Sequence, residues 1–488
     1  MSGSALRPLD RLHRKPLPAC AAALFTLASP ASVFAADWIV NSCDQGNSGD
    51  LPSRTGTLRF AVENAASGDN IDMTALACGK ISLSTGSIRI NQHDLAIFGP
   101  GSGQLAIDGK FVQNANTYSD KDRIIRHSGT GTLAIYGLSL TSGDVRSTTG
   151  DVRGGCLLSN GDVYLYDVAV RTCSAKTSAS ARIALGGAIY TLGDLTAYYS
   201  VIASSNATSA STGNAGGGGA FTNGALVINH ATIDSNTATG GPLVGVGGGA
   251  VVSGNASIFA STISNNVAGR NAGGIDVFNY TPGALVTTIS DSTVSGNSAG
   301  YLVGGVFADS GHVTIENSTI AFNKAAVRSR SGDYTNIFAA GVTLSALHGS
   351  IAVNLQSTLI ANNTVKNKEW DLSAPYADPP TTTVTFSAAP ANNLVRSADT
   401  ATAARLPADT STACPLLGPL RGNGGFTATH ALYSTSAAID AGNDIGAFDF
   451  DQRDDARVSG TFADIGAYEV QQDDIVFNAG FDGCPALP

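Results

Sequence analysis

The stretch GGAFTNGALVINHATIDSN, residues 218–236, contains one complete copy of the pattern that decides the fold. It opens on a glycine doublet and continues through Leu226 and Ile228, which stand two positions apart and so share one face of a strand. A second short strand follows around Ile233, and Asn236 comes three positions after that isoleucine. A unit of such short strands cannot bury its own apolar face, so it must stack on further copies of itself.

The same plan recurs between residues 154 and 362, with glycine doublets 25 to 36 residues apart. This spacing is typical of stacked supersecondary repeats. We therefore predict an all-β, right-handed parallel β-helix whose turn asparagines form a hydrogen-bonded ladder from coil to coil. The alternative, a low-complexity linker, does not explain the constant three-residue offset of the asparagines. The predicted ladder residues are Asn236, Asn266, Asn297, Asn323 and Asn362.

The N-terminus has the features of a secretory signal. Positive residues such as Arg7 and Lys15 precede an apolar run from Leu17 to Leu27, and small residues follow near Ala36. We assign residues 1–36 to a signal peptide, the alternative being a buried first helix. The apolar run is too short to span a membrane, and no later stretch is long enough, so we expect no transmembrane segment.

Six cysteines remain after this segment, and an even number outside the cytosol favours disulfides. Proximity in sequence makes Cys43–Cys78, Cys156–Cys173 and Cys414–Cys484 the first pairing to consider. No cysteine pair has the short spacing of a zinc site. The net charge of −10, with scattered Lys and Arg, is wrong for a nucleic-acid partner.

Residues 56–65, GTLRFAVENA, and the following Asp69-Asn70-Ile71-Asp72 resemble the CSLREA domain. Within them, Leu58, Val62 and Ala65 suit one face of a helix. We therefore expect a short N-terminal helix that caps the first coil, because a solenoid needs its open end shielded.

The C-terminal part resembles the choice-of-anchor Q domain, and the repeats resemble those of polymorphic outer-membrane proteins. These resemblances imply a secreted or surface-displayed bacterial β-helix. No apolar anchor helix follows the motifs, so secretion without an anchor is the alternative. The matching C-terminal motifs are Gly418-Pro419-Leu420, Asn423-Gly424-Gly425, Thr429-His430-Ala431-Leu432, Ala438-Ile439-Asp440-Ala441-Gly442, Asp451-Gln452-Arg453 and Asp464-Ile465-Gly466-Ala467-Tyr468-Glu469.

Carbohydrate enzymes on β-helices need carboxylates grouped on neighbouring coils. At the position of Asp234 the next coils carry Ser264, Ser295 and Ala321, so no such group forms there. The histidines are isolated, and His430 is expected to be a structural hydrogen-bonding residue. The acidic run from Asp440 to Asp455 could bind calcium, but it lacks a calcium-loop spacing and reads first as a solvated turn.

We therefore expect no cofactor and no metal, and a non-catalytic scaffold for adhesion or for interaction with carbohydrate or protein. The alternative is a polysaccharide lyase or glycoside hydrolase. We expect a monomer that is secreted or held at the cell surface. The expected parts are a signal peptide (1–36), an N-terminal cap with the first coils (37–150), the β-helix repeats (151–395), a choice-of-anchor Q-like segment (396–470) and a tail (471–488).

Overall fold

The computed structural model describes residues 35–45, 55–109, 123–240, 245–278, 285–309, 311–327, 338–346, 348–374, 382–388, 390–443, 449–472, 474 and 484. Structural statements below refer to these residues. The expected signal peptide lies outside them except for its last two positions, and so does most of the tail.

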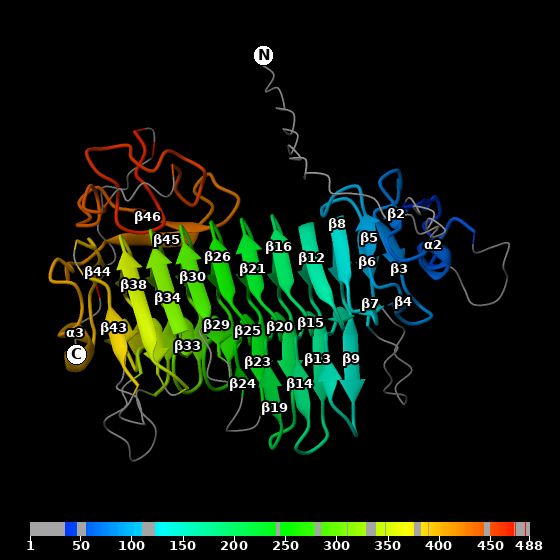
Figure 1. The fold of residues 1–488 in the computed structure, drawn as a ribbon, viewed down its shortest axis with the longest axis horizontal. Coiled ribbons are helices and arrows are strands. Elements are labelled where there is room, and N and C mark those ends of the chain that lie inside the picture. The colour runs from blue at the N-terminus through cyan, green and yellow to red at the C-terminus, as the bar shows by residue number, and fades with distance from the viewer. Residues whose placement is uncertain are drawn as a thin grey trace, which may run out of the picture. The chain divides into compact units, whose positions relative to one another are not determined.

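Each coil is built from short strands that pair in parallel with the same strands of the next coil. In one coil these are β20 (Ala220–Thr222), β21 (Leu226–Asn229), β22 (Thr232–Asp234) and β23 (Thr237–Thr239). The register is strict, because Ile228 pairs with Ile258 and Ile233 pairs with Ile263 one coil on. The expected all-β parallel β-helix is therefore confirmed (Figure 1).

The largest sheet contains two rows of strands, which we name the open row and the covered row. The long strands β8 (Thr132–Thr141) and β12 (Asp162–Arg171) contribute their first halves to the open row and their second halves to the covered row. The open row also contains β1 (Asp37–Ile39), β2 (Asn70–Asp72), β5 (Leu95–Phe98), β16 (Leu195–Tyr198), β21, β26 (Ala256–Phe259), β30 (Val286–Ser290), β34 (Gly311–Glu316), β38 (Ile351–Gln356) and β43 (Val384–Phe386). The covered row also contains β3 (Lys80–Ser82), β6 (Ala106–Asp108), β17 (Val201–Ala203), β22, β27 (Thr262–Ser264), β31 (Thr293–Ser295), β35 (Thr319–Ala321), β39 (Leu359–Ala361) and β44 (Leu394–Val395).

Three smaller sheets complete the coils. One contains β4 (Ile88–Ile90), β7 (Ile125–His127), β11 (Leu157–Ser159), β15 (Ile189–Thr191), β20, β25 (Ala250–Val252), β29 (Ile275–Val277), β33 (Val306–Asp309), β37 (Val342–Ser345) and β42 (Leu372–Ser373). The second contains β9 (Asp144–Ser147), β13 (Ser174–Thr177), β18 (Asn206–Thr208), β23, β28 (Val267–Ala268), β32 (Ser298–Ala299), β36 (Lys324–Ala325), β40 (Thr364–Val365) and the antiparallel β41 (Lys368–Glu369). The third contains β10 (Val152–Arg153), β14 (Ile183–Leu185), β19 (Asn214–Gly216) and β24 (Gly245–Val246).

The core is made of apolar columns, because like residues lie over like residues in successive coils. Ile202, Ile233, Ile263, Val294 and Ile320 form one such column and are all at most 1% exposed. Burial of such side chains contributes roughly 1.5 to 3 kcal/mol each.

The first coil is capped by the helix α2 (Leu58–Asn64), as expected. The Thr57 hydroxyl accepts the Phe60 N–H and so begins the helix, a typical N-cap. Its Leu58, Ala61 and Val62 are buried within the main core, and α2 lies at the N-terminal end of the stack (Figure 1).

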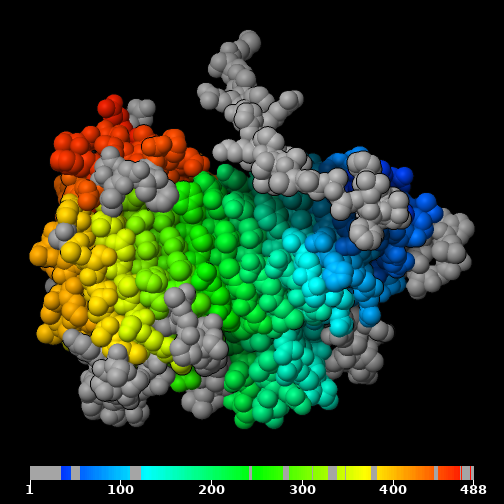
Figure 2. Space-filling model, in the orientation of Figure 1, coloured from blue at the N-terminus to red at the C-terminus, as the bar shows by residue number. Residues whose placement is uncertain are grey.

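After the last coils and the short helix α3 (Thr400–Ala403), the chain turns back along the stack. We name residues 411–472 the C-terminal segment. It contains the antiparallel pair β45 (Leu417–Arg421) and β46 (Thr429–Leu432). The segment, orange to red in Figure 2, lies along one edge of the coils, where it packs on the covered row.

Candidate functional site

Three disulfides join the cysteine pairs that are nearest in sequence. Cys43 bonds to Cys78, Cys156 to Cys173 and Cys414 to Cys484. Cys156 and Cys173 belong to one coil, which their bond closes. Cys173 stands at the ladder position, since its N–H donates to Ser205 Oγ and the Ser205 N–H donates to Asn236 Oδ1. Three disulfides are typical of proteins outside the cytosol.

The asparagine ladder runs through Asn236, Asn266, Asn297 and Asn323, but its next member is Asn363 rather than Asn362. Each amide Nδ2 donates to the Oδ1 of the next coil, at 3.0, 2.9, 2.9 and 2.8 Å in turn. The Asn363 amide donates to Asp371 Oδ1, which ends the ladder. Burial, together with the Glu369 carboxyl, raises the pKa of Asp371 well above its usual range.

The choice of Asn362 was wrong because two apolar residues are adjacent in this coil. Ile360, not Leu359, pairs with Ile320 and continues the inner column, so the three-residue offset leads to Asn363. Leu359 faces outward, where it packs with Leu417 and Ile465 of the C-terminal segment. Asn362 instead donates its backbone N–H to Glu369 Oε1.

The outward face of the covered row from β27 to β39 is occupied by the C-terminal segment. Gln452 donates from Nε2 to Thr262 Oγ1 at 2.9 Å and accepts from Thr293 Oγ1 at 2.6 Å. His430 Nδ1 donates to the Gly418 carbonyl, so its Nε2 accepts from Ser295 Oγ at 2.7 Å. Burial lowers the pKa of His430 to about 4, which keeps the ring neutral. The position at which carboxylates were sought, that of Ser264 and Ser295, is therefore buried. At Ser295 it contacts the C-terminal segment.

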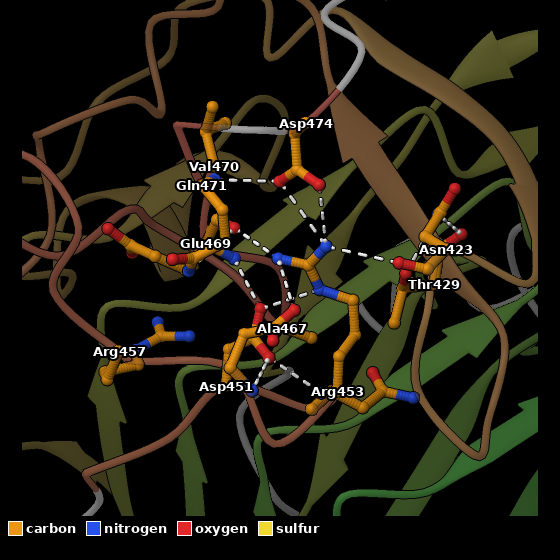
Figure 3. Close-up of polar contacts among 12 residues, drawn as sticks. Asn423, Thr429, Asp451, Arg453, Arg457, Ala467, Glu469, Val470, Gln471 and Asp474 are labelled. Atoms are coloured by element: carbon orange, nitrogen blue, oxygen red, sulfur yellow. Dashed lines mark hydrogen bonds and ion pairs between the residues drawn. The ribbon is translucent and has the colours of Figure 1, made fainter. Parts of the chain in front are cut away.

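A buried network centred on Arg453 holds the C-terminal segment together (Figure 3). Arg453 Nε donates to Asp451 Oδ2 at 2.9 Å, and the guanidinium lies 3.8 Å from the ring centroid of Tyr468. Asp451 also accepts the N–H groups of Arg453 and Glu469. Burial raises the pKa of Glu469 to about 7. These are the motif residues of the sequence, and in the structure they contact one another.

The acidic run considered for calcium has protein partners for several of its described oxygens. Asp454 Oδ1 lies 2.9 Å from His230 Nε2, and Asp455 Oδ2 lies 3.5 Å from Arg453 Nη2. Asp440 Oδ1 accepts from Thr461 and Phe462, while Asp464 accepts from Asp440 and Val470. Asp444 lies outside the described residues. Within the described part of the chain, no group of three or more His, Cys, Asp or Glu is placed to hold a metal ion.

The open row presents a continuous strip of aromatic rings to solvent, which we name the aromatic strip. Its rings lie on the outward face of β5, β8, β12 and β16 and at the turn after β16, and neighbours are 4.7 to 5.8 Å apart between ring centroids along the main contacts. The strip consists of Phe98, Tyr136, Tyr164, Tyr166, Tyr198 and Tyr199.

The most exposed rings of the strip are Tyr166 at 43% and Tyr199 at 36%. They meet at 65°, which leaves a ring face open, whereas Phe98 and Tyr136 stack face to face at 5°. Burial and the nearby Asp454 raise the pKa of Tyr199, and burial and Tyr136 raise that of Tyr164. Both phenols therefore remain neutral hydrogen-bond donors over the physiological range.

Further along the open row the aromatic rings give way to hydroxyl and amide groups. A shallow groove of about 220 Å³ crosses β34, β38 and β43 and is lined by residues that include Thr314, Asn354, Thr385 and Phe386. The outward positions at β26 and β30 carry Ser257 and Thr288. Among the described residues, this part of the open row therefore offers hydroxyl and amide groups beyond the aromatic strip.

Our sequence reasoning missed the strip, although a signal was present. The strings AIYGL, YLYDV and AYYSV, which carry Tyr136, Tyr164, Tyr166, Tyr198 and Tyr199, recur at about the spacing of the glycine doublets. Reading outward strand positions column by column would have found it.

These observations define the chain as a parallel β-helix protein with a segment docked on one row of its largest sheet. No protein-family model matches the chain, and no curated protein matches its sequence. Among solved structures, the crystal structure of pectate lyase Pel9A is similar, at 13% identity and a TM-score of 0.38 over 89% of this chain and 96% of that chain. So distant a likeness says nothing about activity. In the described residues, no helix is long and apolar enough to cross a membrane.

Proposed function

We propose that the chain is a secreted or surface-displayed β-helix that binds carbohydrate along the open row, without catalysis. The aromatic strip is the observation that carries this proposal. The C–H faces of sugar rings pack on aromatic faces, and Tyr, Thr and Asn groups supply hydrogen bonds to sugar hydroxyls. The open row offers aromatic faces from β5 to β16, followed by hydroxyl and amide groups from β26 to β43.

The same proposal includes a relationship to the choice-of-anchor Q and CSLREA families, with the parts divided at residues 36, 150, 395 and 470. Its support is the role of the motif residues, since Gln452 and His430 attach the C-terminal segment to the coils. The three disulfides support a location outside the cytosol.

A binding assay tests the function directly. The chain is passed over immobilised insoluble and soluble polysaccharides, beside the double variant Tyr166→Ala, Tyr199→Ala. Alanine is compatible with the positive φ of 48° at position 199, because Ala260 occupies the equivalent place two coils on with a φ of 45°. We expect retention of the parent chain and at least about a tenfold loss for the double variant, equal to roughly 1.4 kcal/mol.

The control is Phe462→Ala, which removes a ring that is 57% exposed on the C-terminal segment. Equal loss in this variant would mean unspecific adhesion through exposed rings. Binding to no polysaccharide, with retention of a protein instead, would overturn the carbohydrate proposal. Release of reducing ends or unsaturated sugars would show that the chain is an enzyme.

A further inference from the structure

We infer that the carbohydrate bound by the open row is an uncharged linear glycan, and that Phe426 of the C-terminal segment forms one wall of its site. The inference rests on the proposed function and narrows it to a ligand class and to one further binding residue. Two independent observations carry it, the charge of the open row and the placement of Phe426.

The outward positions of the open row from β5 to β43 carry no lysine or arginine in the described strands. Polyuronates carry a negative charge on every sugar, so a site for them needs cations to compensate the desolvation. The outward residues of the paired strands are Ala96, Phe98, Thr132, Ala134, Tyr136, Asp162, Tyr164, Tyr166, Thr196, Tyr198, Val227, Asn229, Ser257, Phe259, Val286, Thr288, Ser290, His312, Thr314, Glu316, Ala352, Asn354, Gln356 and Thr385.

Carboxylates border the aromatic strip on both sides. Asp162 begins β12 and Asp194 directly precedes β16, and each accepts a backbone N–H from the following coil. Asp167 ends the open-row half of β12 and binds Ser102. With a net charge of −10 for the whole chain, this border repels an anionic polymer and leaves an uncharged one unaffected.

Phe426 meets Tyr199 edge to face, with ring centroids 5.4 Å apart and planes at 89°. Its ring is 51% exposed, although the residues after it are fixed to the coils. The Thr427 hydroxyl donates to the Ala260 carbonyl at 3.1 Å, and Thr262 Oγ1 donates to the Ala428 carbonyl at 2.6 Å. The ring is therefore held in place rather than left free, and it extends the aromatic strip beyond the strands.

The perpendicular rings of Tyr199 and Phe426 form a corner at the end of the strip. A sugar that stacks on one ring presents its edge to the other, so both rings contact the same unit. Because coils lie about 4.8 Å apart, an extended glycan that runs along the stack meets another ring of the strip at each coil. An open face that carries aromatic rings and, in the described strands, no outward lysine or arginine favours shape and stacking over ion pairing with an anionic polymer.

The experiment measures binding of two soluble polymers of matched length, an uncharged mixed-linkage β-glucan and polygalacturonate, by affinity electrophoresis or calorimetry. We expect binding of the β-glucan alone, with little change between low and high salt because no ion pair is made. Phe426→Ala should weaken it at least about fivefold, near 1 kcal/mol. The matched control Phe462→Ala should bind as the parent does, since position 462 lies four residues before Gly466, which binds Ser357 five coils beyond Tyr199.

The outcomes separate the two proposals. If polygalacturonate binds and Tyr166→Ala, Tyr199→Ala abolishes this, the neutral class is overturned while the carbohydrate function stands. If Phe426→Ala binds the glucan as well as the parent does, Phe426 is no part of the site. If neither polymer nor any other glycan binds, the proposed function itself fails.

Discussion

Arg457 Nη1 lies 3.8 Å from Asp291 Oδ1, and both side chains are almost wholly buried, at 3% and 1% exposed. This pair joins the C-terminal segment to the turn between the open and covered rows. Among the described residues, no donor meets either carboxylate oxygen of Asp291 with hydrogen-bond geometry. Burial raises the pKa of Asp291 to about 7, although the Arg457 charge opposes the rise.

The raised pKa predicts a stability that falls as pH rises. The folded chain holds the Asp291 proton to about pH 7, whereas the unfolded chain releases it near pH 4, so its contribution is complete below pH 4 and is lost on the way to pH 7. The free energy of unfolding should decline over this window by an amount on the order of 4 kcal/mol from this group. Thermal unfolding from pH 4.5 to 8 measures it, and Asp291→Asn should flatten the decline. An unchanged slope in that variant would show that Asp291 is already ionised.

His430 predicts the opposite slope at lower pH. Its pKa of about 4 lies below the unfolded value, so its contribution is present above pH 6.5 and is lost as pH falls toward 4. We expect His430→Gln, which keeps a donor and an acceptor, to be less stable than the parent at pH 7 and closer to it at pH 4. Melting temperatures at the two pH values give this comparison. A constant difference would mean that His430 titrates normally.

The two adjacent asparagines provide a matched test of the ladder. Asn363→Ala should destabilise strongly, by about 1 to 3 kcal/mol for each buried group that it leaves unpaired, because Asn323 donates to it from two nitrogens. Asn362→Gly should cost little, since glycine suits the φ of 60° at that position. Urea unfolding distinguishes them, and equal losses would contradict the register that places only Asn363 in the column.

The Cys156–Cys173 disulfide, which closes a single coil, should stabilise the fold by more than the entropy of its short loop predicts. In Cys156→Ala, Cys173→Ala the loss of a 17-residue separation predicts roughly 3 kcal/mol from chain entropy alone. The variant also removes a buried residue from the ladder position. A guanidinium titration of the double variant against the parent measures the loss. A change below about 1 kcal/mol would indicate that neighbouring coils hold the loop without the bond.

The repeat was readable from the sequence because like residues stack on like, so that Ile233, Ile263 and Asn266 keep a constant spacing through many coils. The same reasoning chose Asn362 wrongly, because Leu359 does not belong to the inner column. Its apolar side chain packs on the C-terminal segment instead. Nothing local marks that contact, since its partners lie more than 50 residues further along the chain. The roles of Gln452 and Arg453 could not be predicted either, because a sequence motif identifies residues but not the residues that they contact.

The aromatic strip illustrates a second limit. A tyrosine on a strand is usually read as part of a core, and only the register reveals that Tyr136, Tyr166 and Tyr198 occupy one outward column. Phe426 could not be foreseen at all, because its place beside Tyr199 depends on the path of a segment that returns over more than 200 residues.

The contacts of Gln452 with Thr262 and Thr293 also constrain the order of assembly. Because residues 411–472 dock on side chains from several coils, those coils must form before the segment can take its place. Until then the row of Thr262, Thr293 and Thr319 faces water, and hydroxyl-bearing side chains tolerate that interval where isoleucine would invite pairing with another chain. Truncation before residue 411 should leave coils that form, but it exposes the apolar side chain of Leu359 and so favours self-association.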